Sequence, residues 1–472
     1  MGTHLGKVPL TLSLMAGILG SGRAYGKVID GGPQKLSQVS SIGESLRRAG
    51  QRPLHILYVH GIGATGAGGS WMFQQQICAF LKDCTVAKAP VPLEREYADS
   101  GEFKIGATPP GLEYLGHPVW NTMEEWQASA PFVDHYVLKR SDGGPIVVDE
   151  INWWPLVFSL KCRAIMRGEA QLAGPNKSLL NLCSQETAPD KNHPGRFTAY
   201  QWIDPQEAKN LESIRPKGAL FNRWLKNNIL DWGFADAIMA VGSLHDIFRE
   251  GMRQLFVKSA RFQADGSKTY QWQEQLSNPR GIDREFVVVS HSLGSYLVFS
   301  TLNGEQRDAS SQGAANQDES GTATEDAAAR YILERTSLVY FFANQVPLLE
   351  SANMTESKAS ESAQAKAQPE AAGVLGGQLM KWKNLRQDFG MAPEGAEESA
   401  RPLQRQVIAW SDPSDLLTWR VPAMDGLVVD NLYVRNTWWH WLIANPGAAH
   451  GDYAKNKNVL RVMLGARPPE AK

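Results

Sequence analysis

Residues 284–300 read Arg284-Glu-Phe-Val-Val-Val-Ser-His-Ser-Leu-Gly-Ser-Tyr-Leu-Val-Phe-Ser300. Four strand-forming residues, Phe286 to Val289, run into a short turn of small residues and then into an apolar helical stretch. A strand, a sharp turn and a helix in this order predict that Ser292 lies on a strained turn at the carboxyl end of a buried parallel strand. Its hydroxyl would then stand clear of the sheet at the N-terminus of the helix, where a nucleophile is needed.

The two arms of such a turn pass close together, so small residues must flank the serine. Ser290 and Gly294 meet this requirement. The common pattern is Gly-x-Ser-x-Gly, and this chain departs from it by placing Ser290 at the first glycine. A plain helix N-cap is the alternative interpretation of the same five residues, because serine is a favoured N-cap residue.

The composition excludes several classes of protein. With 472 residues, the chain can form one large α/β domain with insertions, or two or three average domains. A formal net charge of −1 gives no signature of polyanion binding and argues against nucleic acid as the main partner. The four cysteines form no Cys-x-x-Cys pair, and a structural metal is therefore not expected.

The cellular location depends on the N-terminus. Residues 1–26 carry a positive charge up to Lys7, a short apolar run from Val8 to Gly20 and small residues around Ala24. This pattern predicts a signal peptide and a secreted or periplasmic protein, while an ordinary N-terminus of a cytoplasmic protein is the alternative. The sequence has no run of about 18 or more apolar residues, so no membrane-spanning helix is expected.

The cysteines have two interpretations. Four buried free thiols are favoured for Cys78, Cys84, Cys162 and Cys183. If the protein is exported, a disulfide between Cys162 and Cys183 that braces an insertion is the alternative.

A second glycine-rich turn follows an early strand. Pro53 to Val59 is mostly apolar, and it ends in His60-Gly-Ile-Gly63, before a helix that we expect over Trp71–Leu81. Glycines in such a loop let a backbone N–H come close to a substrate and stabilise an oxyanion. The alternative is a tight strand-to-helix turn that binds nothing.

We expect one domain over residues 45–472, with an insertion or cap at 155–235. Residues 219–258 show helical spacing, which fits either an apolar cap over the active site or an ordinary buried helical layer. Residues 303–328 and 351–373 are rich in small and polar side chains and predict disordered surface loops.

The final third of the chain supplies candidates for an acid. A serine hydroxyl needs a histidine to remove its proton, and the histidine needs a carboxylate to fix its tautomer. Asp412 and Asp415 follow the strand expected at Arg405–Trp410. Asp412 precedes Pro413 and resembles a turn-initiating residue, whereas Asp415 precedes two leucines that can anchor its loop in the core. Asp415 is therefore preferred and Asp412 remains the alternative.

The base must also be chosen. We call residues Ser411–Asp415 the acid loop. Of the ten histidines, only His440 and His450 lie downstream of both the serine turn and this loop. His450 lies in a turn-rich loop after the last expected strand, with Gly451 beside it, so we prefer it as the base. His440 lies among three tryptophans and is interpreted as a packing residue. His291 should point away from its neighbour Ser292 and is interpreted as structural.

Four motifs now stand in order: His60-Gly-Ile-Gly63, Ser290-His-Ser-Leu-Gly294, Ser411-Asp-Pro-Ser-Asp415 and Ala448-Ala-His-Gly-Asp-Tyr453. This set resembles the serine hydrolases of the α/β-hydrolase superfamily, in the lipase and esterase branch, over about Leu54 to Leu464.

The resemblance implies an α/β fold with a mostly parallel sheet flanked by helices. It also implies a triad of Ser292, Asp415 and His450, and an oxyanion hole made by the Ile62 and Leu293 amides.

The expected activity is hydrolysis of carboxylic esters through an acyl-enzyme, with no cofactor. The tryptophan-rich surroundings of His450 and the possible cap favour a lipid or acyl ester and transient contact with a membrane surface. A thioesterase or acyltransferase with the same triad is one alternative. A catalytically inactive hydrolase fold that serves in binding is another. The oligomeric state stays open.

Overall fold

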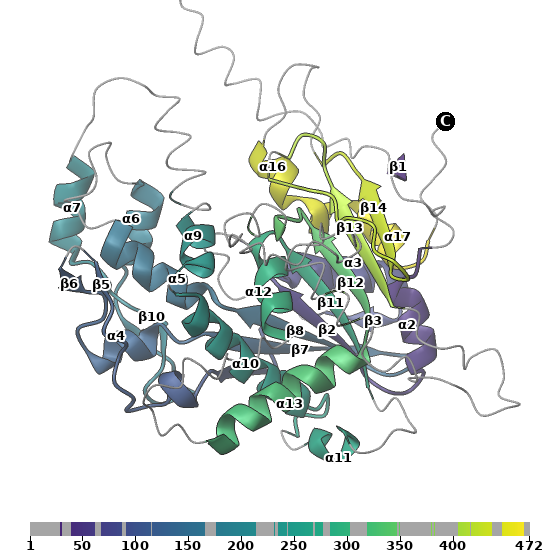
Figure 1. Cartoon of the computed structure of the whole chain (residues 1–472), viewed down its shortest axis with the longest axis horizontal. Coiled ribbons are helices and arrows are strands. Elements are labelled where there is room, and N and C mark those ends of the chain that lie inside the picture. The colour runs from purple at the N-terminus through teal and green to yellow at the C-terminus, as the bar shows by residue number, and fades with distance from the viewer. Residues whose placement is uncertain are drawn as a thin grey trace, which may run out of the picture.

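The computed structural model of the chain describes residues 29–30, 39–61, 68–86, 91–114, 116–165, 176–213, 231, 235–242, 244–267, 270–276, 284–302, 319–346, 349, 379, 382, 405–415, 417–436 and 446–466. One large mixed sheet runs through these residues, with helices on both of its faces (Figure 1). This arrangement belongs to the α/β class.

The strands of the sheet are β1 (Ile29–Asp30), β2 (Leu54–Val59), β3 (Cys84–Thr85), β4 (Glu94–Tyr97), β7 (Phe132–Arg140), β8 (Ile146–Asn152), β11 (Glu285–His291), β12 (Thr336–Phe342), β13 (Gln406–Ser411) and β14 (Val428–Tyr433). Their spatial order is β1-β14-β13-β12-β11-β2-β8-β7-β3, and β4 also pairs with β7. Neighbouring strands from β14 to β8 are parallel, whereas β1, β3, β4 and β7 pair antiparallel.

Strand β11 lies inside the parallel part of the sheet and is buried on both faces. Val287 and Val289 pack on one face, and Phe286 and Val288 pack on the other. The first face is covered by α2 (Ile42–Ala49), α3 (Trp71–Leu81) and α17 (Lys457–Met463). The second is covered by α10 (His245–Arg261), α12 (Leu293–Leu302) and α13 (Glu319–Arg335). A continuous apolar run is what a parallel strand between two helical layers needs.

Helix α2 is not among the elements expected from the sequence, although the sequence carries a local signal for it. The Ser41 hydroxyl accepts from the Glu44 amide, and the Glu44 carboxylate accepts from the Ser41 amide. This capping box satisfies two of the donors that a helix N-terminus leaves open.

Strand β7 is also missing from the expected elements, because buried polar residues interrupt its apolar pattern. His135 of β7 and His55 of β2 both contact Asp149 of β8, with Nδ1 of each ring 2.6 and 3.2 Å from the carboxylate oxygens. Nε2 of His135 lies 3.3 Å from Oε2 of Glu96 on β4. These four buried side chains form a polar row across the sheet, which we call the His–Asp row.

The region of the expected insertion contains several short helices. They are α5 (Trp154–Leu160), a π-helix (Lys161–Ile165), α6 (Lys177–Cys183), α7 (Pro205–Ser213) and α9 (Ala235–Val241), and α4 (Met123–Ala128) packs beside them. Two hairpins of short strands also occur: β5 (Glu113–Tyr114) with β6 (His117–Pro118), and β9 (Ala188–Pro189) with β10 (Phe197–Ala199). In Figure 1 most of these elements lie to the left of the sheet.

Covalent and ionic links hold this region together. A disulfide joins Cys162 of the π-helix to Cys183 of α6, and a buried ion pair joins Lys161 to Asp236 of α9. A second disulfide joins Cys78 to Cys84, so the favoured interpretation of four free thiols is wrong. This second pair is difficult to predict from the sequence, because the two cysteines are only six residues apart. They meet only because α3 ends between them and the chain turns back.

The disordered loop expected at 303–328 is wrong from Glu319 onward, where α13 begins. Ala328 and Ala329 are buried in the layer that α13 shares with α10, so the small residues that suggested low complexity serve close helix packing. Residues 303–318 and the loop expected at 351–373 lie outside the described residues. No helix in the described part of the chain is long and apolar enough to cross a membrane.

Candidate active site

Ser292 lies between the end of β11 and the start of α12. Its backbone φ is 54°, in the left-handed region that side-chain-bearing residues avoid. Such a conformation costs about 1–2 kcal/mol for a residue other than glycine. The Ser292 amide donates to the Phe342 carbonyl of β12 at 2.8 Å, which holds the strained turn in place.

The residues that flank Ser292 explain how the turn fits. A Cβ added to Gly294 would lie 2.4 Å from the His60 carbonyl oxygen, so only glycine is tolerated at this position. Ser290, which stands where glycine is common, is buried and donates its hydroxyl to Ser295 at 3.0 Å. The departure from the common pattern is thereby accommodated by one internal hydrogen bond.

The structure brings Ser292, His450 and Asp415 together. His450 lies in α16 (Pro446–Gly451), and its Nε2 is 3.0 Å from the Ser292 Oγ. Its Nδ1 is 3.0 Å from each carboxylate oxygen of Asp415. Asp415 is buried, and His450 is mostly buried. This geometry allows the imidazole to take a proton from the serine while the carboxylate fixes its tautomer.

Asp412 has different partners. Its carboxylate accepts from the Ser414 amide at 2.8 Å and from the Asn436 amide at 2.6 Å. Burial raises its pKa. Of the two aspartates considered from the sequence, Asp415 is the one that contacts His450, and Asp412 ties the acid loop to the segment after β14. His440 lies outside the described residues.

Of the two amides expected for an oxyanion hole, that of Leu293 belongs to the described residues. Leu293 is the first residue of α12, so its N–H has no carbonyl partner within the helix. Ile62 lies outside the described residues. Its neighbour Gly61 is described, and a Cβ there would lie 2.8 Å from the Ser292 Cβ. The absence of a side chain at Gly61 therefore lets this loop approach the nucleophile.

Both ends of the glycine-rich loop after β2 are fixed by distant residues. At its start, Trp153 Nε1 donates to the His60 carbonyl at 3.1 Å, and the two rings stack with centroids 5.1 Å apart. Burial lowers the pKa of His60 to about 4, so its imidazole is neutral.

At the end of the loop, Glu150 of β8 accepts from the Gly68 and Gly69 amides, each at 2.9 Å, and from the Ser70 amide at 2.8 Å. The sequence pattern assigns no role to Glu150. Glu150 and its neighbour Asp149 interrupt an otherwise apolar strand, but this pattern does not show which backbone amides Glu150 binds.

Tyr453 is the last residue of the His450 motif, which gives it no role. It lies three residues beyond His450, is fully buried, and places its hydroxyl between the two aspartates of the acid loop.

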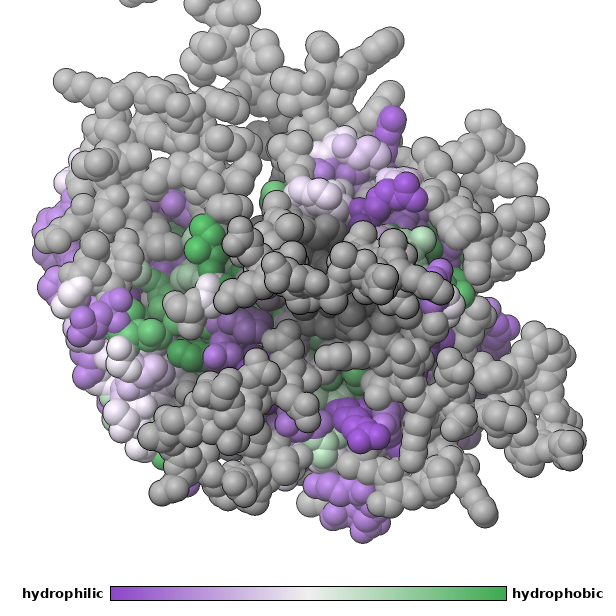
Figure 2. Space-filling model, in the orientation of Figure 1, coloured by the Kyte–Doolittle hydropathy of each residue, from purple (hydrophilic) through white to green (hydrophobic). Residues whose placement is uncertain are grey.

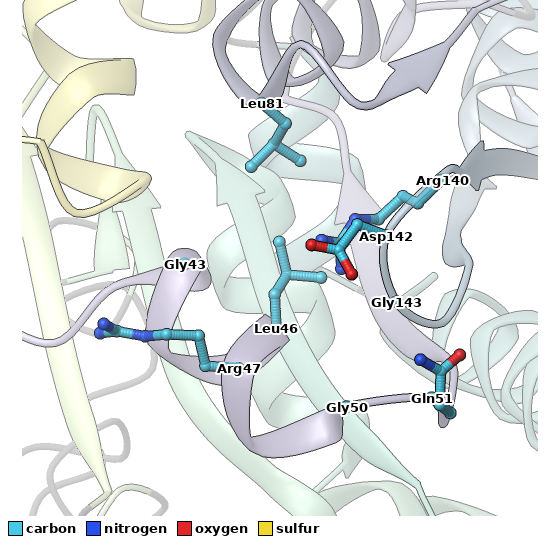
Figure 3. A pocket seen from close by; sticks show the side chains of 9 residues that line it. All are labelled: Gly43, Leu46, Arg47, Gly50, Gln51, Leu81, Arg140, Asp142 and Gly143. Carbon is cyan, nitrogen blue, oxygen red and sulfur yellow. The ribbon is translucent and has the colours of Figure 1, made fainter.

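A pocket of about 320 Å³ lies elsewhere, at the amino ends of the parallel strands (Figure 3). Arg47, Arg140 and Asp142 are among its lining residues, and Gly50 and Gly143 come just before β2 and β8. The triad side chains lie beyond the carboxyl ends of the strands, so this pocket is not their substrate site. Charges of both signs line it, and Arg140 is already paired with Asp83 at 2.8 Å.

Within the described ranges, no group of three or more His, Cys, Asp or Glu side chains is placed to hold a metal ion. Comparisons of the chain with protein-family models, with curated proteins and with solved structures found no match.

Proposed function

We propose that this protein is a serine hydrolase of the α/β-hydrolase superfamily that cleaves carboxylic esters. One observation carries the proposal. Ser292 lies on a left-handed turn between a buried parallel strand and a helix, with its Oγ 3.0 Å from a histidine that in turn lies 3.0 Å from a buried carboxylate. Such a strained turn costs conformational free energy, and strain of this kind is typical of a residue that acts as a nucleophile.

The order of the strands supports the proposed superfamily. Ser292 follows β11, Asp415 follows β13 and His450 follows β14, and these three strands belong to the parallel part of the sheet. Ligands of open α/β sheets bind outside the carboxyl ends of the strands, which is where all three loops emerge.

In the proposed reaction, the Ser292 oxygen attacks the ester carbonyl carbon while His450 Nε2 takes the hydroxyl proton. Asp415 stabilises the imidazolium that forms. His450 then gives this proton to the leaving alcohol, and an acyl-enzyme remains on Ser292. Water attacks the acyl group, again with His450 as the base, and its proton finally returns to Ser292 as the acid is released.

The negative charge of the tetrahedral intermediate needs donors that are already oriented. The Leu293 amide at the start of α12 is one, and the positive end of the helix dipole adds to it. We assign the second donor to Ile62, because its loop starts beside Ser292 at Gly61 and is held at its two ends by Trp153 and Glu150. The mechanism requires neither a metal nor a redox cofactor.

A lipid or acyl ester is the proposed substrate class. Two large apolar side chains are exposed on helices linked to the site: Met72, in the first turn of the helix α3 that follows the glycine-rich loop, is 40% exposed, and Ile238 of α9 is 59% exposed. Helix α9 packs on α10, which packs on the nucleophile helix α12. Figure 2 shows apolar residues gathered where Figure 1 draws α9. Exposed apolar groups support an acyl chain or a membrane surface as the partner.

We also propose that the protein is secreted or periplasmic. Two disulfides support this location, because they form and persist in oxidising compartments. The signal peptide expected at residues 1–26 lies outside the described residues.

The experiment that tests the activity is labelling with a fluorophosphonate probe, followed by peptide mapping. We expect the probe to modify Ser292 in the wild-type protein. Ser292→Ala should abolish labelling, and His450→Ala should lower its rate by about 10⁴-fold or more because the serine loses its base. Hydrolysis of p-nitrophenyl esters of increasing chain length then tests the substrate class. A folded wild-type protein that is not labelled at Ser292 would overturn the proposal and favour a binding protein.

A further inference from the structure

The side chain of His291, the residue before Ser292, reaches the loop that carries His450. Its Nε2 lies 2.6 Å from the His450 carbonyl oxygen, and the two imidazole centroids are 5.0 Å apart. A carbonyl oxygen only accepts, so Nε2 of His291 carries a hydrogen and donates it. The strand that presents the nucleophile is therefore bonded to the backbone of the residue proposed as its base.

The helix that carries His450 explains why this bond is needed. Helix α16 has only six residues, and the carbonyls of its last turn have no partner within the helix. Asn436 Nδ2 donates to the Ala449 carbonyl at 2.9 Å, and His291 donates to the next carbonyl along. Two side chains from outside the helix therefore bind two successive carbonyls at its end and fix the backbone from which the imidazole extends.

The same ring also contacts the start of the glycine-rich loop. A Cβ added to Gly61 would lie 2.4 Å from Nδ1 of His291, so the Gly61 backbone is packed directly on the imidazole. His291 thus touches the loop of the proposed oxyanion donor, adjoins the nucleophile and binds the backbone of the base.

We propose that His291 is a positioning residue for the triad: its Nε2–H bond to the His450 carbonyl sets the distance between the His450 imidazole and Ser292. This inference rests on the proposed function, and it extends that function to a residue that the sequence motif leaves without a role.

The charge state of His291 fits this role. Burial lowers its pKa to about 3, and the neighbouring His450 imidazole acts in the same direction. The other titratable groups that act on it are Asp415, which raises its pKa, and His60, which lowers it. A neutral ring at ordinary pH keeps one donor for the carbonyl and does not repel the imidazolium that forms on His450 during the reaction.

The test compares two amide side chains that differ by one methylene group. In His291→Gln the amide N–H can reach the position of Nε2, whereas in His291→Asn it is too short to reach the His450 carbonyl. His291→Leu, which fills the space without a donor, serves as a second variant. All are measured as full-length, disulfide-bonded protein, by the rate of fluorophosphonate labelling at Ser292 and by kcat and KM for a p-nitrophenyl ester.

We expect His291→Gln to stay within about 10-fold of the wild-type labelling rate, and His291→Asn and His291→Leu to fall by about 10²-fold, as for a misplacement of about 1 Å. The loss should appear in kcat, with KM changed less than about twofold, because substrate binding does not use this bond.

Two results would overturn the inference: equal rates for the Gln and Asn variants, or failure of both the Asn and the Leu variant to fold, which would assign His291 to fold stability. Failure of the proposed function is seen separately, as absence of labelling in the wild-type protein.

Discussion

The hydroxyl of Tyr453 lies 3.3 Å from Oδ2 of Asp415, the carboxylate that contacts His450. The Tyr453 hydroxyl oxygen also accepts from the Asp412 amide at 2.6 Å. Burial raises the pKa of Tyr453 well above its ordinary value, so the hydroxyl remains a donor. Its ring stacks on Phe342, at the end of the strand next to β11, with centroids 5.8 Å apart. Tyr453 therefore connects the acid loop to the core beneath the site.

Tyr453→Phe should lower the free energy of unfolding by about 1–3 kcal/mol, because the buried Asp412 amide loses its acceptor. Urea unfolding measures this. Tyr136→Phe is the matched control, because the buried Tyr136 hydroxyl has no hydrogen-bond partner among the described residues, and its removal should cost nothing. Equal stability of the two variants would show that the Tyr453 hydroxyl contributes nothing to the fold.

The two aspartates of the acid loop should separate in their effects. Asp415→Asn should lower the labelling rate of Ser292 by about 10⁴-fold, since the amide cannot hold His450 in the tautomer that accepts the proton. Asp412→Asn should change the rate by less than about 10-fold and lower the free energy of unfolding by about 1–3 kcal/mol, since it weakens bonds to two backbone amides. The reverse pattern of rates would make Asp412 the acid.

The strain of the left-handed turn at Ser292 should be measurable as a difference in stability between two variants. Ser292→Gly and Ser292→Ala should both be inactive. Relief of strain should raise the free energy of unfolding of the glycine variant by about 1 kcal/mol relative to the alanine variant, and the extra backbone entropy that glycine loses on folding reduces this difference. Thermal unfolding of the two inactive variants makes the comparison without any contribution from catalysis. Higher stability of Ser292→Ala would argue that the turn is unstrained.

The His–Asp row predicts a dependence of stability on pH. Burial by itself would lower the pKa of His135, but its contacts with Asp149 and Glu96 outweigh this and raise the pKa to about 9. A raised pKa means that protonated His135 stabilises the fold fully below the unfolded value of about 6.5, and that this stabilisation is lost as the pH rises through about 9.

Urea unfolding of the wild type and of His135→Asn from pH 6 to pH 10 measures this effect. We expect the difference between the two proteins to shrink across that range. His117→Asn, at an exposed position, should show no such trend. A difference that stays constant with pH would mean that His135 is neutral in the folded protein.

Asp149, in the same row, should make stability depend on pH in the opposite direction. Burial would raise the pKa of Asp149, but its bonds to His135 and His55 lower it to about 2. Its stabilising contribution is therefore present above about pH 4 and declines as the pH falls toward 2.

The two disulfides should contribute unequally to the free energy of unfolding. Cys162 and Cys183 are separated by 21 residues and Cys78 and Cys84 by 6. Loop-closure entropy predicts losses of about 3 kcal/mol for Cys162→Ala with Cys183→Ala, and about 2 kcal/mol for the other double variant. Urea unfolding of each double variant tests the order. A larger loss at the shorter loop would show that chain entropy does not set these contributions.

The sequence predicts β11, β12 and β13 because buried parallel strands are apolar on both faces, so their composition alone reveals them. It does not predict β7. Asp134 and His135 interrupt the apolar pattern there, and their partners Arg95 and Asp149 are found only once the chain has folded. Local pattern cannot report a polar residue that is buried by a distant partner.

The same distinction holds at the site. Ser292, Asp415 and His450 can be named because each stands in a turn after an expected strand, and the structure places them within hydrogen-bond distance. The roles of Glu150 and Tyr453 could not be found this way. Their partners lie about 80 and about 40 residues away, and nothing in the neighbouring sequence marks the contact.

The His–Asp row also constrains how this protein can change over evolutionary time. Neighbouring members of the row satisfy one another's charge or hydrogen bond, so replacing one member removes a partner from another buried polar group. Single substitutions along the row should therefore be strongly epistatic. A library that varies these positions one at a time should return the starting residues, whereas one that varies them together, with apolar residues of similar volume, should recover folded proteins that have lost the row entirely.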